Sequence, residues 1–212
     1  MTPNTPQEGD RAATTHDYAR LRSSVRIVAL ANLGYFGVEF AVATAIGSVA
    51  LFADSIDFLE DASLNALILL GLYWTARARA QLGMMLAAVL LVPGVATLWS
   101  AWQAWHLGQV PAPIPLTLAG LGALFVNVSC ALLLARVRHV EGSLTRAAFL
   151  SARNDVFANL GIIGAGFVTA LTRSLWPDLL VGLGIFVMNL DAAREVYTAA
   201  RAEHARAQTA RP

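Results

Sequence analysis

The chain has 212 residues, of which 57% are hydrophobic and only 14% are charged, and its mean hydropathy is +0.57. Soluble domains carry about 25% charged residues, so this composition argues against a soluble globular protein. The net charge is only +1 and all fifteen basic residues are Arg, which leaves no excess of positive charge for nucleic-acid binding. The single cysteine, Cys130, excludes an intrachain disulfide framework.

The chain divides into a short polar start, a long apolar region and a short polar end. Residues 1–25 lack the basic-then-apolar pattern of a secretory signal, and we expect them to form a disordered cytoplasmic tail. Six apolar stretches follow, each near the roughly 20 residues that a helix needs to cross a bilayer core of ~30 Å. The predicted spans are 26–48, 50–75, 82–106, 115–135, 147–171 and 177–197. Residues 198–212 are too few to bury a core, and we expect a second short cytoplasmic tail. The sequence thus predicts an all-α integral membrane protein with one six-helix transmembrane domain over 26–197.

The distribution of Arg predicts the orientation of these spans. Six crossings put both termini on one side of the membrane. Thirteen of the fifteen Arg residues flank the spans on that side, whereas the alternate loops hold only Arg173 and the fifth span holds Arg153. Positively charged loops stay in the cytoplasm. We therefore expect a multi-pass protein of the cell (inner) membrane with both termini cytoplasmic.

The second predicted span carries four acidic residues, and an acid at the centre of a spanning helix costs at least about 2.5 kcal/mol. At about 100° per residue, Asp54, Asp61 and Asn65 lie nearly on one line along the helix. Asp57 lies about 60° to one side of that line and Glu60 about another 60° beyond. Such a face either lines a path for cations or belongs to a surface segment. The apolar residues that flank it on both sides favour the cation path.

The fifth predicted span repeats this spacing. Ser151, Asp155 and Asn159 follow one another at i+4 steps and so share one helix face. The matching residues in the second span are Asp57, Asp61 and Asn65. Because these two spans run in opposite directions, the match suits an inverted repeat of three plus three helices. The alternative is a chance match over three positions.

Three carboxylates would converge if the two polar faces meet: Asp57, Asp61 and Asp155. They repel one another unless a cation neutralises them or protons are taken up, which links metal occupancy to protonation. An oxygen-rich set of this kind suits a divalent ion. Glu39 in the first span is either a proton-relay group or a structural acid, and Asn32 is expected to hydrogen-bond between helices.

The run from Gly47 to Asp57, followed by Asp61 and preceded by Glu39 in the first span, resembles the first two helices of the cation diffusion facilitator (cation efflux) family. In that family a Ser-x-Ala-Leu-x-Ala-Asp-Ser run leads to a His or Asp and, four residues later, to an Asp. Asp155 and Asn159 fit the pattern of the family's fifth helix. The resemblance covers all six spans.

The resemblance implies a function and a site. It implies proton-coupled efflux of divalent transition-metal cations of the Zn, Co, Fe, Mn or Cd class, by alternating access in the lipid bilayer, with no permanently bound cofactor. The implied metal ligands are Asp57, Asp61 and Asp155. The fourth ligand position holds Ser151 where the family usually has His or Asp. Ser151, Asn154 or water would then complete the shell, and the missing His weakens the case for zinc.

Two further expectations concern the class of protein. Many family members carry a cytoplasmic C-terminal domain, for which this chain is too short, so a homodimer would form through the transmembrane helices. An enzyme is not expected, because Cys130 has no His in the spans around it to act as a base. The alternative to a transporter is a membrane protein of the same fold that binds a metal or a partner without moving ions.

Overall fold

The structure is a computed structural model that describes residues 8–71, 95–137, 143–190 and 194, with the side chains of 8–18, 70–71 and 143–151 outside the description. These described residues form six helices and no strand, as the sequence predicts. The helices are α1 (Glu8–Ile46), α2 (Val49–Gly71), a helix over 95–107, α4 (Pro113–Val137), α5 (Ser143–Thr172) and a last helix, Trp176–Leu190. The start of the third predicted span and the whole predicted C-terminal tail, 198–212, lie outside the described residues.

Helix α1 is longer than the predicted span 26–48. It begins at Glu8, so the prediction of a disordered tail is wrong for residues 8–25. This segment contains several Ala and Arg residues, which are good helix formers, and both of its nearby prolines precede it. Extending a helix costs little once a nucleus exists, and the membrane span supplies that nucleus.

A two-residue turn joins α1 to α2. Gly47 has a φ of +68°, a left-handed conformation that glycine adopts without steric penalty. The Ser48 N–H donates to the Ala43 carbonyl at 3.0 Å and closes the end of α1. The Ser48 hydroxyl accepts the Leu51 N–H at 3.1 Å and caps α2. The turn therefore sends α2 back alongside α1.

The chain turns between the third and fourth predicted spans. The helix over 95–107 stops before Gly108, which has a φ of +62°. Helix α4 begins at Pro113, two residues before the predicted first residue, Pro115. Proline suits the first turn of a helix, where its missing N–H is not needed.

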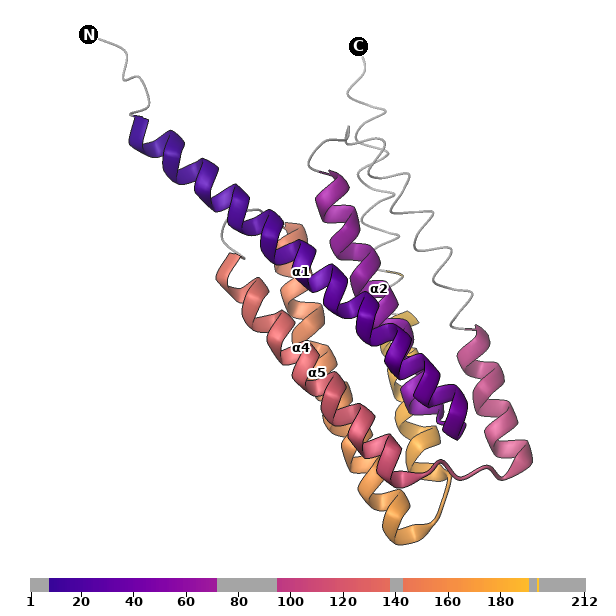
Figure 1. The fold of residues 1–212 in the computed structure, drawn as a ribbon. Helices are drawn as coiled ribbons and strands as arrows, with labels where there is room; N and C mark the ends of the chain where they lie inside the picture. Colours follow the sequence, from indigo (N-terminus) through magenta and orange to yellow (C-terminus); the bar gives the residue numbers. More distant parts are fainter. Residues whose placement is uncertain (1–7, 72–94, 138–142, 191–193, 195–212) are drawn as a thin grey trace, which may run out of the picture.

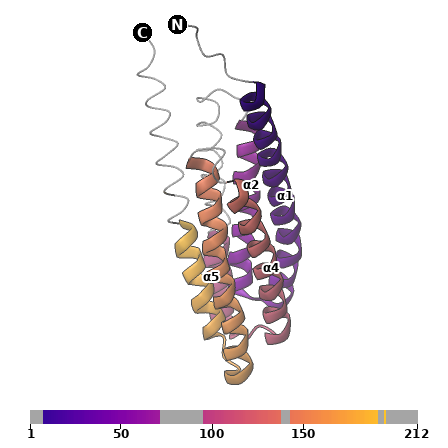
Figure 2. The ribbon, with the colours of Figure 1, turned by 90° about the vertical axis from the view of Figure 1, so that its left-hand side faces the viewer.

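Helices α1, α2, α4 and α5 pack into one bundle (Figures 1 and 2). Helix α1 packs against α2 and α4, and α5 packs against α4 and α2. The helix over 95–107 and the last helix meet the beginning of α2 in a separate apolar cluster that contains Val49, Ala101, Ala104 and Leu179. Through this cluster, the beginning of α2 contacts both the helix over 95–107 and the last helix.

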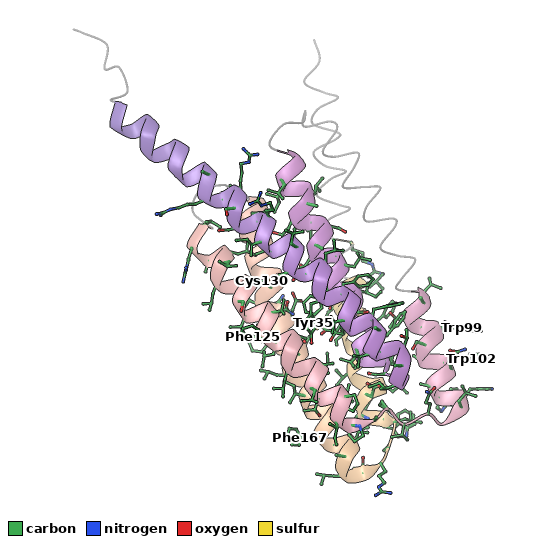
Figure 3. All side chains as sticks on the ribbon, in the orientation of Figure 1. Tyr35, Trp99, Trp102, Phe125, Cys130 and Phe167 are labelled. Carbon is green, nitrogen blue, oxygen red and sulfur yellow. The ribbon has the colours of Figure 1, made fainter. Side chains whose placement is uncertain are left out.

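Many large apolar side chains point away from the bundle, as expected for a surface in contact with lipid. Trp99, Trp102, Phe125 and Phe167 are among them (Figure 3). Three described helical segments are long and apolar enough to cross a membrane: Ala19–Ile46, Pro113–Val137 and Ala152–Thr172. Helix α2 is as long as a span but carries the four acidic residues, and the last helix is apolar but shorter.

Candidate metal-transport site

A layer of polar side chains crosses the bundle between two apolar clusters, one towards each end. Members of one cluster are Val28, Ile68, Leu134 and Ala152. Members of the other are Ala43, Leu51, Leu116 and Ile162. Both clusters draw on α1, α2, α4 and α5, and the acidic residues of α2 lie between them along the chain. The polar layer is thus enclosed at mid-bundle, the position predicted for a cation path.

The polar face of α2 is turned into the bundle. Asp54, Asp61 and Asn65, which the sequence places on one line, are all buried, and Asp57 is half-buried. Glu60 is buried as well. Turning these groups inward removes them from lipid, where an unpaired charge is costly. The prediction of an inward-facing acidic surface on α2 is confirmed.

Helix α5 brings a third carboxylate to this face. Asp155 is half-buried and interacts electrostatically with Asp57. Its carboxyl group also lies within hydrogen-bonding range of that of Asp61. Asn159, one turn further along α5, is fully buried. Asp155 therefore lies on the part of α5 that interacts with the acidic face of the antiparallel helix α2.

The complete coordination shell remains a prediction. Ser151 lies in α5 one turn before Asp155, but its side chain is outside the described residues. Asn154, the alternative fourth ligand, is exposed. Among the described residues, no group of three His, Cys, Asp or Glu side chains is arranged so that it could hold one metal ion. Asp57, Asp61 and Asp155 interact with one another, but they are not arranged as a complete set of metal ligands.

Asn32 connects α1 to the candidate site, a contact that sequence reasoning did not find. It is fully buried, and its Nδ2 donates to Oδ2 of Asp61 at 3.4 Å. Its Oδ1 accepts the Cys130 thiol of α4 at 3.7 Å, on the inward side of the bundle (Figure 3). Asn32 was expected to hydrogen-bond between helices, and that expectation is confirmed. The new information is that its partner is a candidate ligand.

Glu39 and Asp54 form a second acidic pair, between α1 and α2. Both side chains are 0% exposed. No donor among the described residues reaches any of their four carboxylate oxygens. The two carboxyl groups interact with each other across the contact between α1 and α2. This pair is a buried polar feature of the bundle that the candidate metal ligands do not explain.

Asp178, in the last helix, holds the beginning of α2 from outside the four-helix bundle. It is 2% exposed, and its Oδ1 accepts the Ser48 hydroxyl at 2.6 Å. Its two oxygens also accept the backbone N–H groups of Val49 at 2.8 Å and of Ala50 at 3.3 Å. The sequence contains a signal for this role of Asp178, because an acid directly after Trp176 and Pro177 lies at the start of a predicted span.

Comparison with known proteins identifies the family. A family model for the cation efflux transmembrane domain matches residues 25–201. The chain belongs to the cation efflux family. A search of curated proteins finds no match to the chain. The family match agrees with the resemblance seen in the α1–α2 sequence and covers the whole six-helix region.

Family membership fixes the general function. Cation efflux proteins are membrane transporters of metal cations and not enzymes. The acidic layer inside the bundle accords with this function, because carboxylates are ligands for divalent cations. The chain is therefore a membrane protein of a metal-efflux family, with the acidic faces of α2 and α5 as its candidate site.

Proposed function

We propose that this member of the cation efflux family exports divalent transition-metal ions in exchange for protons, with Asp57, Asp61 and Asp155 as metal ligands and Ser151 as the fourth. The observation that carries the proposal is the meeting of carboxylates from α2 and α5 inside the bundle. Buried acids that repel one another favour binding of a cation or of protons, so exchange of one for the other follows from their proximity.

The two apolar clusters support alternating access to this site. One lies on each side of the polar layer, and both involve α1, α2, α4 and α5. An ion that crosses the protein must pass both clusters. Opening them in turn, never together, would let a metal ion enter from one side and leave from the other without a continuous leak.

We also propose that the protein is a multi-pass protein of the inner membrane and works as a homodimer. Both termini would lie in the cytoplasm, as the Arg distribution predicts. The dimer would form through the transmembrane helices, whose outer faces carry many large apolar side chains. Cross-linking in native membranes, followed by denaturing electrophoresis, tests the dimer by the appearance of a species of twice the chain mass.

Uptake into everted membrane vesicles tests the transport function. Export from the cell appears there as uptake of Co²⁺, Zn²⁺ or Mn²⁺, driven by a proton gradient. We expect Asp57→Asn and Asp155→Asn each to abolish uptake, because losing a ligand should cost at least the ~10–100-fold in affinity that outer-shell changes cost. Asn127→Ala is the control, since it removes a buried polar side chain of α4 that is not a proposed ligand.

The outcomes separate the two candidate functions. Wild-type uptake that collapses the proton gradient, with loss in both Asp variants, supports proton-coupled efflux. Metal binding to the purified protein without any uptake would instead support the alternative of a metal-binding membrane protein that does not transport. Full uptake by a folded Asp57→Asn variant would contradict the ligand assignment.

A further inference from the structure

The carboxyl pair of Glu39 and Asp54 lies apart from the residues proposed to hold the metal. Glu39 comes from α1, which supplies none of the proposed ligands, and Asp54 is three residues before Asp57 on α2. Both side chains are completely buried, and no donor of the described residues reaches their oxygens. Their carboxyl groups interact with each other across the contact between α1 and α2.

This geometry requires a proton or another positive charge. Two ionised carboxylates side by side repel each other, and an ionised carboxylate buried without a partner is strongly disfavoured. Ionised carboxylates accept hydrogen bonds but cannot donate them. The two groups can satisfy each other only when one carries a proton, which it then donates to its neighbour. A single shared proton therefore removes both the repulsion and the missing hydrogen bond.

The described residues around the pair supply no positive charge that could replace this proton. The titratable groups that interact with it are Tyr35 on α1, Asp57 and Asp61 on α2, and Asp155 on α5. Helix α4 and the last helix have one charged residue each. That of α4 is Arg136, in its last turn, and that of the last helix is Asp178, which binds the beginning of α2.

The nearest described arginines of α1 and α5 are also unsuited to neutralise the pair. Arg26 is thirteen residues before Glu39 on α1, a separation of roughly 20 Å at 1.5 Å per residue. Arg153 of α5 is exposed, on a different side of its helix from Asp155. Among the residues that the structure describes, the fixed charges that face the pair are therefore acidic, which strengthens its need for a proton.

We propose that Glu39 and Asp54 form a proton-binding site, distinct from the metal ligands, that gives up its proton when a divalent cation binds between α2 and α5. The proposal rests on the proposed function. Asp54 interacts electrostatically with Asp61 and Asp155, so the charge at the metal site acts on the pair. A bound divalent cation repels a proton on the pair and takes over the neutralisation of the acidic layer. Binding of the metal at one site would thus release a proton from the adjacent site.

Calorimetry of metal binding measures this exchange without any transport. The purified full chain is titrated with Co²⁺ in several buffers of different ionisation enthalpy, which gives the number of protons released per metal bound. The variants are Glu39→Gln and Asp54→Asn, which keep the shape of each side chain but cannot hold the shared proton. We expect each to bind Co²⁺ and to release about one proton fewer per chain than the wild type.

Three controls make the result decisive. Asn127→Ala, which removes a buried polar side chain of α4 outside the pair and outside the proposed ligands, should release as many protons as the wild type. Glu39→Asp keeps the carboxyl group and should recover proton release lost in Glu39→Gln. Infrared spectra should show a protonated-carboxyl band that weakens when Co²⁺ is added, and this loss should be smaller in Glu39→Gln than in Glu39→Asp or the wild type.

The outcomes distinguish a failure of this proposal from a failure of the proposed function. Unchanged proton release in Glu39→Gln and Asp54→Asn, with Co²⁺ still bound, overturns the proton site alone. The proposal is also overturned if the wild type binds two Co²⁺ ions and these variants bind only one, because the pair would then be a cation site. A wild type that binds no divalent metal overturns both proposals. Reduced proton release with Co²⁺ binding retained, and loss of the infrared band on adding metal, support the proton site.

Discussion

At the scale of single residues, Asp61 is the most firmly held of the proposed ligands. Its Oδ2 accepts the Asn32 amide at 3.4 Å, and its backbone carbonyl accepts the Asn65 amide at 2.8 Å. The Cys130 thiol in turn donates to Asn32, which fixes which end of the Asn32 amide faces Asp61. Groups that orient a ligand in this way are part of a metal site, because they fix the direction in which the ligand's lone pairs point.

Removal of the Asn32 amide should weaken metal binding without removing a ligand. We expect Asn32→Ala to lower the Co²⁺ affinity of the purified protein by ~10–100-fold, the usual effect of losing a second-layer partner. Asn127→Ala is the matched control, because Asn127 is also a buried asparagine but lies in α4 with no donor of the described residues at its Oδ1. An equal loss of affinity in both variants would show that the effect is general and not due to Asp61.

Ser151 should tune the choice of metal. An all-oxygen shell favours Mn, Mg or Ca, whereas imidazole raises the relative preference for Zn. We expect Ser151→His to raise the ratio of Zn²⁺ to Mn²⁺ in competition uptake, because residues four apart on a helix lie about 5–6 Å apart at Cβ and can share an ion with Asp155. Asn154→His places the same imidazole at an exposed position of α5 and should leave the ratio unchanged. A folded, active Ser151→His variant with the wild-type ratio would place Ser151 outside the shell.

At the scale of helices, the beginning of α2 is where the last helix is attached to the four-helix bundle. Gly182 of the last helix passes so close that a Cβ there would lie 2.7 Å from the Val49 carbonyl carbon. Next to this contact, Asp178 binds the Ser48 hydroxyl and two backbone N–H groups of α2. These N–H groups have no partner within α2, since the first turn of a helix leaves its donors free. The last helix therefore supplies the cap that α2 needs.

Loss of this cap should destabilise the protein. Removing a helix cap costs about 0.5–2 kcal/mol, and the Asp178 contacts also join two helices. We expect Asp178→Ala to lower the unfolding temperature in detergent by about 5 °C. Ser48→Ala should have a smaller effect, because Asp178 still accepts the Val49 and Ala50 N–H groups. Leu180→Ala, on the exposed side of the same helix, is the control. A Ser48→Ala effect as large as that of Asp178→Ala would contradict the backbone part of the cap.

Some of these contacts can be predicted from the sequence and others cannot. The inward face of α2 was predictable because the helical period and the cost of acids in lipid together decide which side turns inward. The link from Asp178 to Val49 was not, since it joins residues 129 positions apart. The Asn32–Asp61 bond likewise depends on how α1 and α2 are rotated against each other, which no local pattern fixes. The helix over residues 8–25 was missed because polar composition was taken as disorder although its residues favour helix.

At the scale of the whole molecule, the charges predict how the bundle sits in the membrane. Helices α1 and α5 run in one direction and α2 and α4 in the other, so each end of the bundle gathers a defined set of loops (Figure 1). Arg136 lies in the last turn of α4, at the end where α1 begins. Arg173 follows α5 at the opposite end, with a φ of +48°. Since Arg-rich ends stay in the cytoplasm, Arg136 should face the cytoplasm and Arg173 the outside.

Cysteine labelling in intact cells tests this orientation. With native Cys130 replaced by Ala, we expect Arg173→Cys to react with a membrane-impermeant maleimide and Arg136→Cys to react only after the cells are permeabilised. The comparison is fair because both side chains are exposed, so a difference in labelling reflects the side of the membrane and not burial. The chain with Cys130 alone should stay unlabelled, because that thiol is buried between α4 and α1. Labelling of Arg136→Cys in intact cells, with Arg173→Cys protected, would invert the topology. It would also reverse the direction of metal transport that the everted-vesicle assay assumes.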